Sequence, residues 1–346
     1  MEGATIVLAV RNGTDYLEAF IASLKQQTHS DWRLLVRDDA STDGTAELVR
    51  RLATEDHRIC LLESDRRQLG ALGSFSRLLQ RAYDCGAQYV FTADHDDLWH
   101  PQKLELQLAE LRRAENSEQG CRPTLVYSDL TVVDQRSQVV AESFFRCSRL
   151  RHGQPRALET LLGRSFVLGC ACAVNRQLLD FALPVPQCVP MHDWWLALCA
   201  AAVGQIVEIP QPLVQYRRHG GNDSGPASFW SGFNPLRYSW RTRWQKGFNS
   251  FRRALAQAQE LRKRLDQRQW PCNQGVRETL EQYCDLFAQH RSRLRTVYEL
   301  SRRGMPPIDL PRRLIYYLCV LKLGPSQSCI RMEQLPCQQN CPLWTY

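Results

Sequence analysis

The 346-residue sequence lacks any long apolar run, and this absence argues against a transmembrane helix. No stretch approaches the roughly 18 uninterrupted apolar residues that a membrane-spanning helix needs. The longest late candidate, Leu314 to Leu323, is too short and contains Lys322. The opening run, Thr5 to Val10, has no basic n-region and no small-residue cleavage site, so we expect no secretory signal. A hydrophobic content of 44% and a charged content of 23% favour a globular protein.

Glycine-rich phosphate-binding signatures are also missing. There is no Walker A sequence, and Gly70-Ala71-Leu72-Gly73 lacks the spacing of a dinucleotide fingerprint. Kinase, P-loop and dehydrogenase chemistry therefore have little support. The 14 cysteines are scattered, with only Cys170 and Cys172, and Cys337 and Cys341, as close pairs. Neither pair has partners at zinc-site spacing, so reduced buried thiols are the favoured interpretation.

The first half alternates segments typical of strands and helices. The pattern predicts strands over Thr5–Val10, Trp32–Arg37, Arg58–Leu62 and Gln88–Thr92, and helices over Asp15–Gln27, Asp43–Ala53, Leu72–Asp84 and Pro101–Ala114. Ser41 or Thr42 is the expected N-cap of the second helix. Regular β-α-β-α order implies a parallel sheet with right-handed crossovers and helices on both faces.

After Pro123 the pattern becomes mixed. It predicts short strands, a buried apolar run and one helix, over Thr124–Ser128, Leu130–Val133, Val139–Phe145, Phe166–Val174, His192–Val203, Ile206–Ile209 and Leu213–Tyr216. Past Gly225 the composition is helical and rich in arginine, over Phe251–Arg268 and Arg277–Arg303. We therefore expect a catalytic domain over residues 1–225 and a basic, mainly helical region over residues 226–346.

The net charge of +8 hides an asymmetry between these two parts. Residues 1–225 hold 24 Lys and Arg against 28 Asp and Glu, whereas residues 226–346 hold 20 against 8. The basic part indicates an anionic surface or a polyanionic partner. A membrane contact is one interpretation, and a solvated helical face or an oligomer contact explains the composition equally well.

The segment Thr92 to Asp97, Thr-Ala-Asp-His-Asp-Asp, is the most informative feature of the chain. It follows the apolar run Gln88 to Phe91, so three carboxylates come just after a buried strand. Ligands of open α/β sheets bind at that carboxyl edge. Crowded carboxylates repel one another unless a cation or a donor-rich ligand neutralises them, as Mg2+ on a diphosphate would. A solvated acidic turn before the helix at Pro101 explains this segment alone equally well.

Five short motifs follow one another in a fixed order. They are Val-Arg-Asn-Gly from Val10, Asp-Asp-Ala-Ser-Thr-Asp-Gly-Thr from Asp38, Asp-His-Asp-Asp-Leu-Trp from Asp94, His-Asp-Trp-Trp from His192 and Tyr-Arg-Arg-His-Gly from Tyr216. In this order the chain resembles the family 2 glycosyltransferases of GT-A fold, and most of all their bacterial rhamnosyltransferase-type branch. The resemblance covers roughly residues 4–225. It implies an α/β fold with a Rossmann-like mixed sheet flanked by helices, as in nucleotide-diphospho-sugar transferases.

For the donor, the resemblance implies that Asp39 binds the nucleoside while Val10 and Asn12 line the base and ribose. Asp94 would face the ribose or lie just outside the direct ligands of the metal. Without the resemblance, capping of its own loop is the better interpretation of Asp39.

For the metal, the resemblance implies Asp96 and His219 as ligands of Mn2+ or Mg2+. A neutral imidazole suits Mn2+ better than Mg2+. Arg217 or Arg218 would neutralise the diphosphate through a guanidinium fork. A basic turn after an edge strand is the alternative for this segment.

For the acceptor, the resemblance implies Asp193 as the catalytic base that removes the proton of the attacking hydroxyl. Asp97, His192, Trp194 and Trp195 would contact the acceptor, although tryptophans on a buried helix are more often core residues.

Together these roles imply an inverting, metal-dependent transfer of a sugar, with rhamnose favoured, from a nucleoside-diphosphate sugar to a saccharide or lipid-linked acceptor of the cell surface. We expect a cytoplasmic enzyme, with peripheral contact to the inner face of the membrane through its basic region, and no nucleic-acid partner. A nucleotidyltransferase that makes nucleotide sugars, or a non-catalytic module that binds them, is the alternative.

Overall fold

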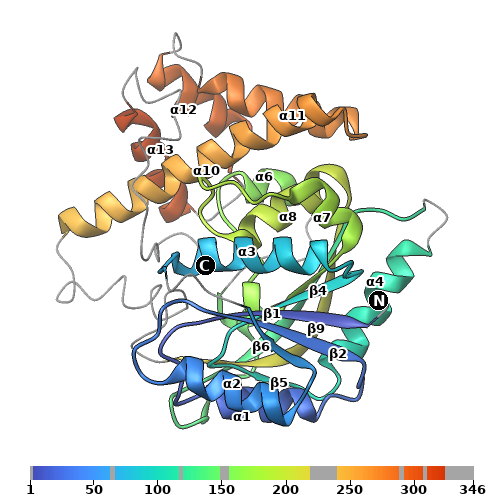
Figure 1. The fold of residues 1–346 in the computed structure, drawn as a ribbon. Coiled ribbons are helices and arrows are strands. Elements are labelled where there is room, and N and C mark those ends of the chain that lie inside the picture. The colour runs from blue at the N-terminus through green and yellow to red at the C-terminus, as the bar shows by residue number, and fades with distance from the viewer. Residues whose placement is uncertain are drawn as a thin grey trace.

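The computed structural model describes residues 3–62, 67–116, 120–148, 156–218, 240–287, 292–306 and 310–323. Its centre is a nine-stranded mixed sheet in the order β3-β2-β1-β4-β8-β6-β9-β5, with β7 paired to β6 (Figure 1). The strands are β1 Ala4–Val10, β2 Trp32–Asp38, β3 Ile59–Leu61, β4 Tyr89–Ala93, β5 Leu98–Trp99, β6 Thr124–Val133, β7 Val139–Ala141, β8 Cys172–Asn175 and β9 Gln205–Arg217.

Helices cover both faces of this sheet, with α1 and α2 on one side and α3 and α8 on the other (Figure 1). The helices of the sheet-bearing part are α1 Leu17–Lys25, α2 Thr45–Glu55, α3 Gly70–Asp84, α4 Lys103–Glu115, α5 Phe144–Ser148, α6 Ala157–Leu161, the 3-10 helix η1 Gly169–Ala171, α7 Arg176–Ala182 and α8 His192–Val203. The later helices are α10 Trp240–Arg268, α11 Gln274–Leu286, α12 Arg293–Arg302 and α13 Leu310–Lys322.

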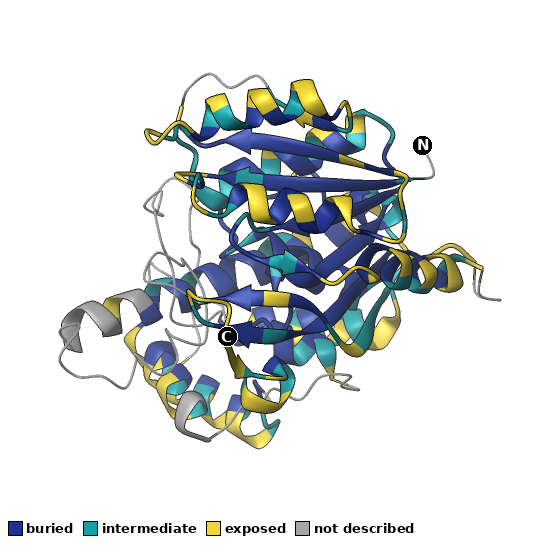
Figure 2. Cartoon of the chain, turned by 90° about the horizontal axis from the view of Figure 1, so that it is seen from below, coloured by how far each residue is buried: buried dark blue, intermediate teal, exposed yellow. Residues whose placement is uncertain are grey.

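The first half of the sheet is parallel, as its alternating sequence predicts. β1 pairs in parallel with both β2 and β4, and β2 with β3. These strands are nearly continuous apolar runs because both of their faces lie under helices. In Figure 2 most of the central strands are buried, while the helices are exposed on their outer sides.

The expected N-cap of α2 is wrong. The helix begins at Thr45, after Gly44 in the left-handed region at φ +90°. The Asp43 carboxylate accepts the Thr45 N–H at 3.1 Å and so takes the capping role. Ser41 and Thr42 instead bond the loop after β1, which holds the two loops together.

The second half of the sheet is mixed, and two pairs of predicted strands are each one longer strand. β6 includes Asp129, and β9 runs through Pro210 and Pro212. The β6–β9 register shifts at this point, from Ser128 opposite Ile209 to Asp129 opposite Pro212. Proline has no N–H for the ladder, so β9 bulges here and then resumes its pairing.

The C-terminal helices pack on the sheet-bearing part through two arginines, the buried Arg264 and the exposed Arg268. Arg264 of α10 donates to the carbonyl oxygens of Ala182 at 2.6 Å and Pro184 at 2.9 Å. Arg268 donates to Leu183 O at 2.7 Å. Because the last carbonyls of a helix have no partner within it, these guanidinium groups cap the carboxyl end of α7. Among the described helices, none is both long and apolar enough to cross a bilayer.

Candidate active site

The carboxyl ends of β1, β2 and β4 lie side by side, so the predicted motifs meet at one edge of the sheet. Val10 pairs with Asp38, and Leu8 pairs with Ala93, which immediately precedes the acidic loop Asp94–Asp97. Motifs about 30 and 80 residues apart in sequence are thereby brought together, as expected for an open α/β sheet.

Asp39 is buried and fully engaged with protein groups. Its Oδ1 accepts from Arg37 Nη1 at 2.5 Å and from Leu69 N–H at 2.7 Å, and its Oδ2 accepts from Gly70 N–H at 2.9 Å. Burial alone would raise the pKa of this carboxyl, but these hydrogen bonds, with one from Ser74, lower it below its usual value. Asp39 is therefore an anion that caps the start of α3. This structural role is independent of the expected binding of a nucleoside.

Asn12 joins two loops at this edge and has the uncommon φ of +51°. Its N–H donates to Ser41 Oγ, and its Oδ1 accepts from Thr42 N–H, both at 2.9 Å. Val10 is buried in the core. Asp38, which the sequence analysis did not single out, is buried, and its Oδ1 has no hydrogen-bond partner among the described residues.

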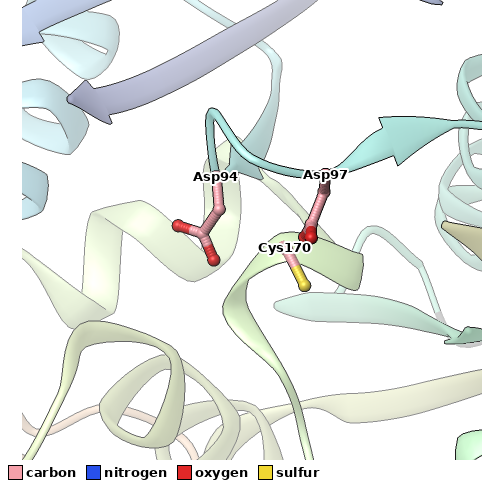
Figure 3. A group of neighbouring side chains, drawn as sticks. All are labelled: Asp94, Asp97 and Cys170. Atoms are coloured by element: carbon pink, nitrogen blue, oxygen red, sulfur yellow. The ribbon is translucent and has the colours of Figure 1, made fainter. Parts of the chain in front are cut away.

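The acidic loop gathers a three-residue group. Ligand atoms of Asp94, Asp97 and Cys170 all lie within 4.8 Å of one another (Figure 3). Asp97 is buried, and its Oδ2 has no hydrogen-bond partner in the described part of the chain. Burial and the neighbouring charges of Asp96 and Asp94 raise the pKa of Asp97 well above its usual value. The group thus has two carboxylates, which fit a divalent cation that would relieve this repulsion, and the thiol of Cys170 as its third member.

Lys103 is completely buried, near Asp97 and Cys170 of the three-residue group. Its Nζ donates to Gln107 Oε1 at 2.8 Å and lies 3.8 Å from the centre of the Trp99 ring. Burial lowers the pKa of Lys103 to about 7, although Cys172, Cys170 and Asp97 act in the opposite direction. Neither Lys103 nor Cys170 was identified from sequence, because only the tertiary fold brings them to the acidic loop.

Arg217 and Arg218 have different surroundings. Arg217 is buried; its N–H donates to Asp97 Oδ1 and its Nε to Asp96 O, both at 3.0 Å. Its Nη1 donates to Ser137 Oγ at 2.9 Å, so it ties the acidic loop to the turn between β6 and β7. The Nε of Arg218 is buried and has no hydrogen-bond partner among the described residues.

Asp193 begins α8 close to η1. A Cβ placed on Gly169 would lie 3.4 Å from Asp193 Oδ2 and 3.3 Å from His192 Nε2. The imidazole of His192 stacks on Phe75 with ring centroids 3.8 Å apart, and neither nitrogen has a partner in the described residues. Burial lowers the pKa of His192 to about 3, so the ring is neutral.

The tryptophans after Asp193 do not contact an acceptor. Trp194 and Trp195 are both 0% exposed. Their indole N–H groups donate to Leu161 O at 2.7 Å and Ala182 O at 2.9 Å. The acceptor assignment for this pair is therefore wrong, because both rings are core residues that offer no face to a sugar.

The expected metal ligands are only partly described. His219 lies outside the described residues. Asp96 is buried beside the three-residue group, but its carboxylate does not belong to it. For the metal, the geometry brings together the carboxylates of Asp94 and Asp97, whereas the resemblance implies Asp96 as the ligand.

Comparison with known proteins identifies the family. The family described as Glycosyl transferase family 2 matches residues 5–180, just over half of the 346 residues. The chain therefore belongs to glycosyl transferase family 2, and its mixed sheet flanked by helices is the GT-A fold of the expected class.

Two relatives and one solved structure illustrate this similarity. TuaG of Bacillus subtilis, named for teichuronic acid biosynthesis, is 33% identical over 104 residues, which are 30% of this chain and 40% of that protein. The Escherichia coli UDP-Glc:alpha-D-GlcNAc-diphosphoundecaprenol beta-1,3-glucosyltransferase WfgD is 34% identical over 105 residues, 30% of this chain and 39% of its own length. The alignments thus span less than half of either relative. TarS of S. aureus, residues 1–349 with UDP, has 14% identity and a TM-score of 0.49 over 92% of this chain and 90% of its own.

Proposed function

We propose that the protein is an inverting glycosyltransferase that uses a nucleoside-diphosphate sugar. One observation supports the proposal: η1 lies between the Asp193 carboxylate and the group formed by Asp94, Asp97 and Cys170. Gly169 approaches Asp193 Oδ2, and the next residue, Cys170, lies against Asp94 and Asp97. In this proposal, the base for the acceptor and the site of the donor diphosphate are neighbours across η1.

In this proposal Asp193 removes the proton of the acceptor hydroxyl as it attacks the anomeric carbon. The attack comes from the face opposite the leaving diphosphate, so the configuration inverts and no covalent nucleophile is needed. Arg218 offers hydrogen bonds to the diphosphate, while Arg217 positions the acidic loop. A Mn2+ or Mg2+ ion held by that loop would neutralise charge that develops on the leaving group.

The donor and acceptor are proposed from chemistry and relatives. Rhamnose from dTDP-rhamnose is the favoured sugar, on resemblance alone. WfgD is named for transfer to a saccharide on diphosphoundecaprenol, and this supports a lipid-linked acceptor and a role in cell-surface polysaccharide synthesis. Such an acceptor would hold the enzyme against the inner face of the cell membrane.

The test is release of nucleoside diphosphate from a panel of nucleotide sugars with Mn2+, Mg2+ or EDTA. We expect metal-dependent release from one donor, lowered about 10²- to 10⁴-fold in Asp193→Asn without loss of donor binding. Failure of dTDP-rhamnose alone would remove the rhamnose proposal. Binding of a donor without turnover, even with acceptor-loaded membranes, would favour a binding module. Pyrophosphate release from a nucleoside triphosphate would favour the nucleotidyltransferase.

A further inference from the structure

An apolar stripe runs along the exposed side of α13. Leu314 is 54% exposed, Ile315 41%, Leu318 51% and Leu321 42%. Their spacing of i, i+1, i+4 and i+7 places them on one face of the helix. The opposite face, with Tyr316, Cys319, Val320 and Leu323, is buried. A helix that is apolar on both faces normally lies inside a core or a lipid layer, yet half of this one faces solvent.

The neighbouring helix adds a second exposed apolar pair. α12 packs against α13, and its Leu294 and Tyr298 are 72% and 65% exposed. Tyrosine is frequent where one side of a surface is apolar and the other is wet. Figure 1 shows both helices among the C-terminal helices, beside α10.

The charges of α12 and α13 indicate what kind of partner would bind this surface. Across α12 and α13 the sequence has six basic residues, Arg293, Arg295, Arg302, Arg312, Arg313 and Lys322, and one acidic residue, Glu299. Two copies of this surface would bring like charges together, which disfavours a dimer. An anionic lipid surface offers both an apolar layer for the leucines and negative headgroups for the basic residues.

We propose that the α12–α13 surface, defined by Leu294, Tyr298, Leu314, Ile315, Leu318 and Leu321, docks the protein on an anionic membrane. α13 would lie in the plane of the interface with its apolar stripe among the acyl chains. This inference rests on the proposed function only for the purpose of docking, which is access to a lipid-linked acceptor. The physical argument for docking does not depend on the proposed function.

The experiment is sedimentation of the full chain with vesicles of phosphatidylcholine and phosphatidylglycerol in a two-to-one mixture. We expect binding that falls with added salt and falls at least tenfold in the double variant Leu314→Glu, Leu318→Glu. The matched control is Val139→Glu, Val140→Glu, which puts the same charges on another exposed apolar pair, on β7. That control should bind within twofold of the wild type.

Several results would overturn the proposal. They are no binding by the wild type, equal binding to phosphatidylcholine alone, or unchanged binding of the Leu314→Glu, Leu318→Glu variant. A shift of that variant from dimer to monomer with unchanged vesicle binding would assign the stripe to self-association instead. Nucleotide release with a water-soluble acceptor is measured in parallel. Vesicle binding lost in the variant, with no release by any form, would support docking and refute the glycosyl transfer.

Discussion

The neutral imidazole of His192 makes stability depend on pH in a way that one substitution can remove. The ring is buried against Phe75, and burial lowers the pKa of His192 from 6.5 to about 3. Because its folded pKa is depressed, the unfolded chain takes up a proton that the folded protein excludes. The contribution of His192 to the free energy of unfolding is therefore fully present above pH 6.5 and is lost as the pH falls toward 3.

His192→Phe keeps a ring against Phe75 and has nothing to protonate. In the unfolded chain His192 has a pKa of 6.5 and takes up a proton between pH 7 and pH 5. This proton uptake lowers the free energy of unfolding of the protein by about 2 kcal/mol. We expect this extra loss in the wild type and not in the variant. The measurement is urea unfolding at both pH values. Any fixed cost of repacking the larger ring cancels in the difference between the two pH values.

The matched control is His57→Gln, which changes an exposed histidine and should follow the wild type. Parallel losses in the wild type and in His192→Phe would refute the reasoning, because the buried ring would then accept a proton without penalty. The stacking on Phe75 would in that case not enforce a neutral imidazole next to Asp193.

Two further predictions concern buried arginines. Arg264→Met should lower the free energy of unfolding by about 3 kcal/mol, because it leaves buried carbonyls at the end of α7 with fewer donors. Arg262→Met, which breaks an exposed ion pair on the same helix, should cost about 0.5 kcal/mol or less in the same denaturation assay, and equal losses would contradict the capping role. Arg217→Gln should weaken metal activation of nucleotide release by about 10- to 100-fold, since Arg217 holds the acidic loop. A metal titration that gives the same midpoint for Arg217→Gln and the exposed Arg136→Gln would contradict this.

The sequence predicted the parallel half of the fold because buried strands and amphipathic helices leave strong local patterns. It divided β6 at Asp129, since a carboxylate usually interrupts a buried strand. In the structure Asp129 is buried but satisfied, because it accepts from Ser143 Oγ, Leu130 N–H and Phe145 N–H. Such partners depend on how the chain returns to the strand, and no local pattern records that.

Residues of the candidate site could be predicted where the residue type itself indicates the chemistry. They could not be predicted where their position depends on tertiary packing. The carboxylates of the acidic loop and of Asp193 could be chosen by type and by position after a strand or at a helix start. Cys170 could not, because its place beside Asp94 and Asp97 depends on how η1 crosses the sheet edge. The tryptophans of α8 were misassigned since an aromatic residue looks the same whether it covers a sugar or fills a core.

The capping of α7 by Arg264 and Arg268 bears on how the protein can be dissected. The change in charge near Gly225 suggests a place to cut the chain, but the guanidinium groups that complete α7 come from beyond it. The ring of Trp195, three residues after the start of α8 at His192, lies 5.0 Å from the Arg264 guanidinium. A shortened chain would lose these partners and expose a face that normally never meets water. The two compositional halves therefore pack against each other, and the basic region contacts both α7 and the helix that carries Asp193.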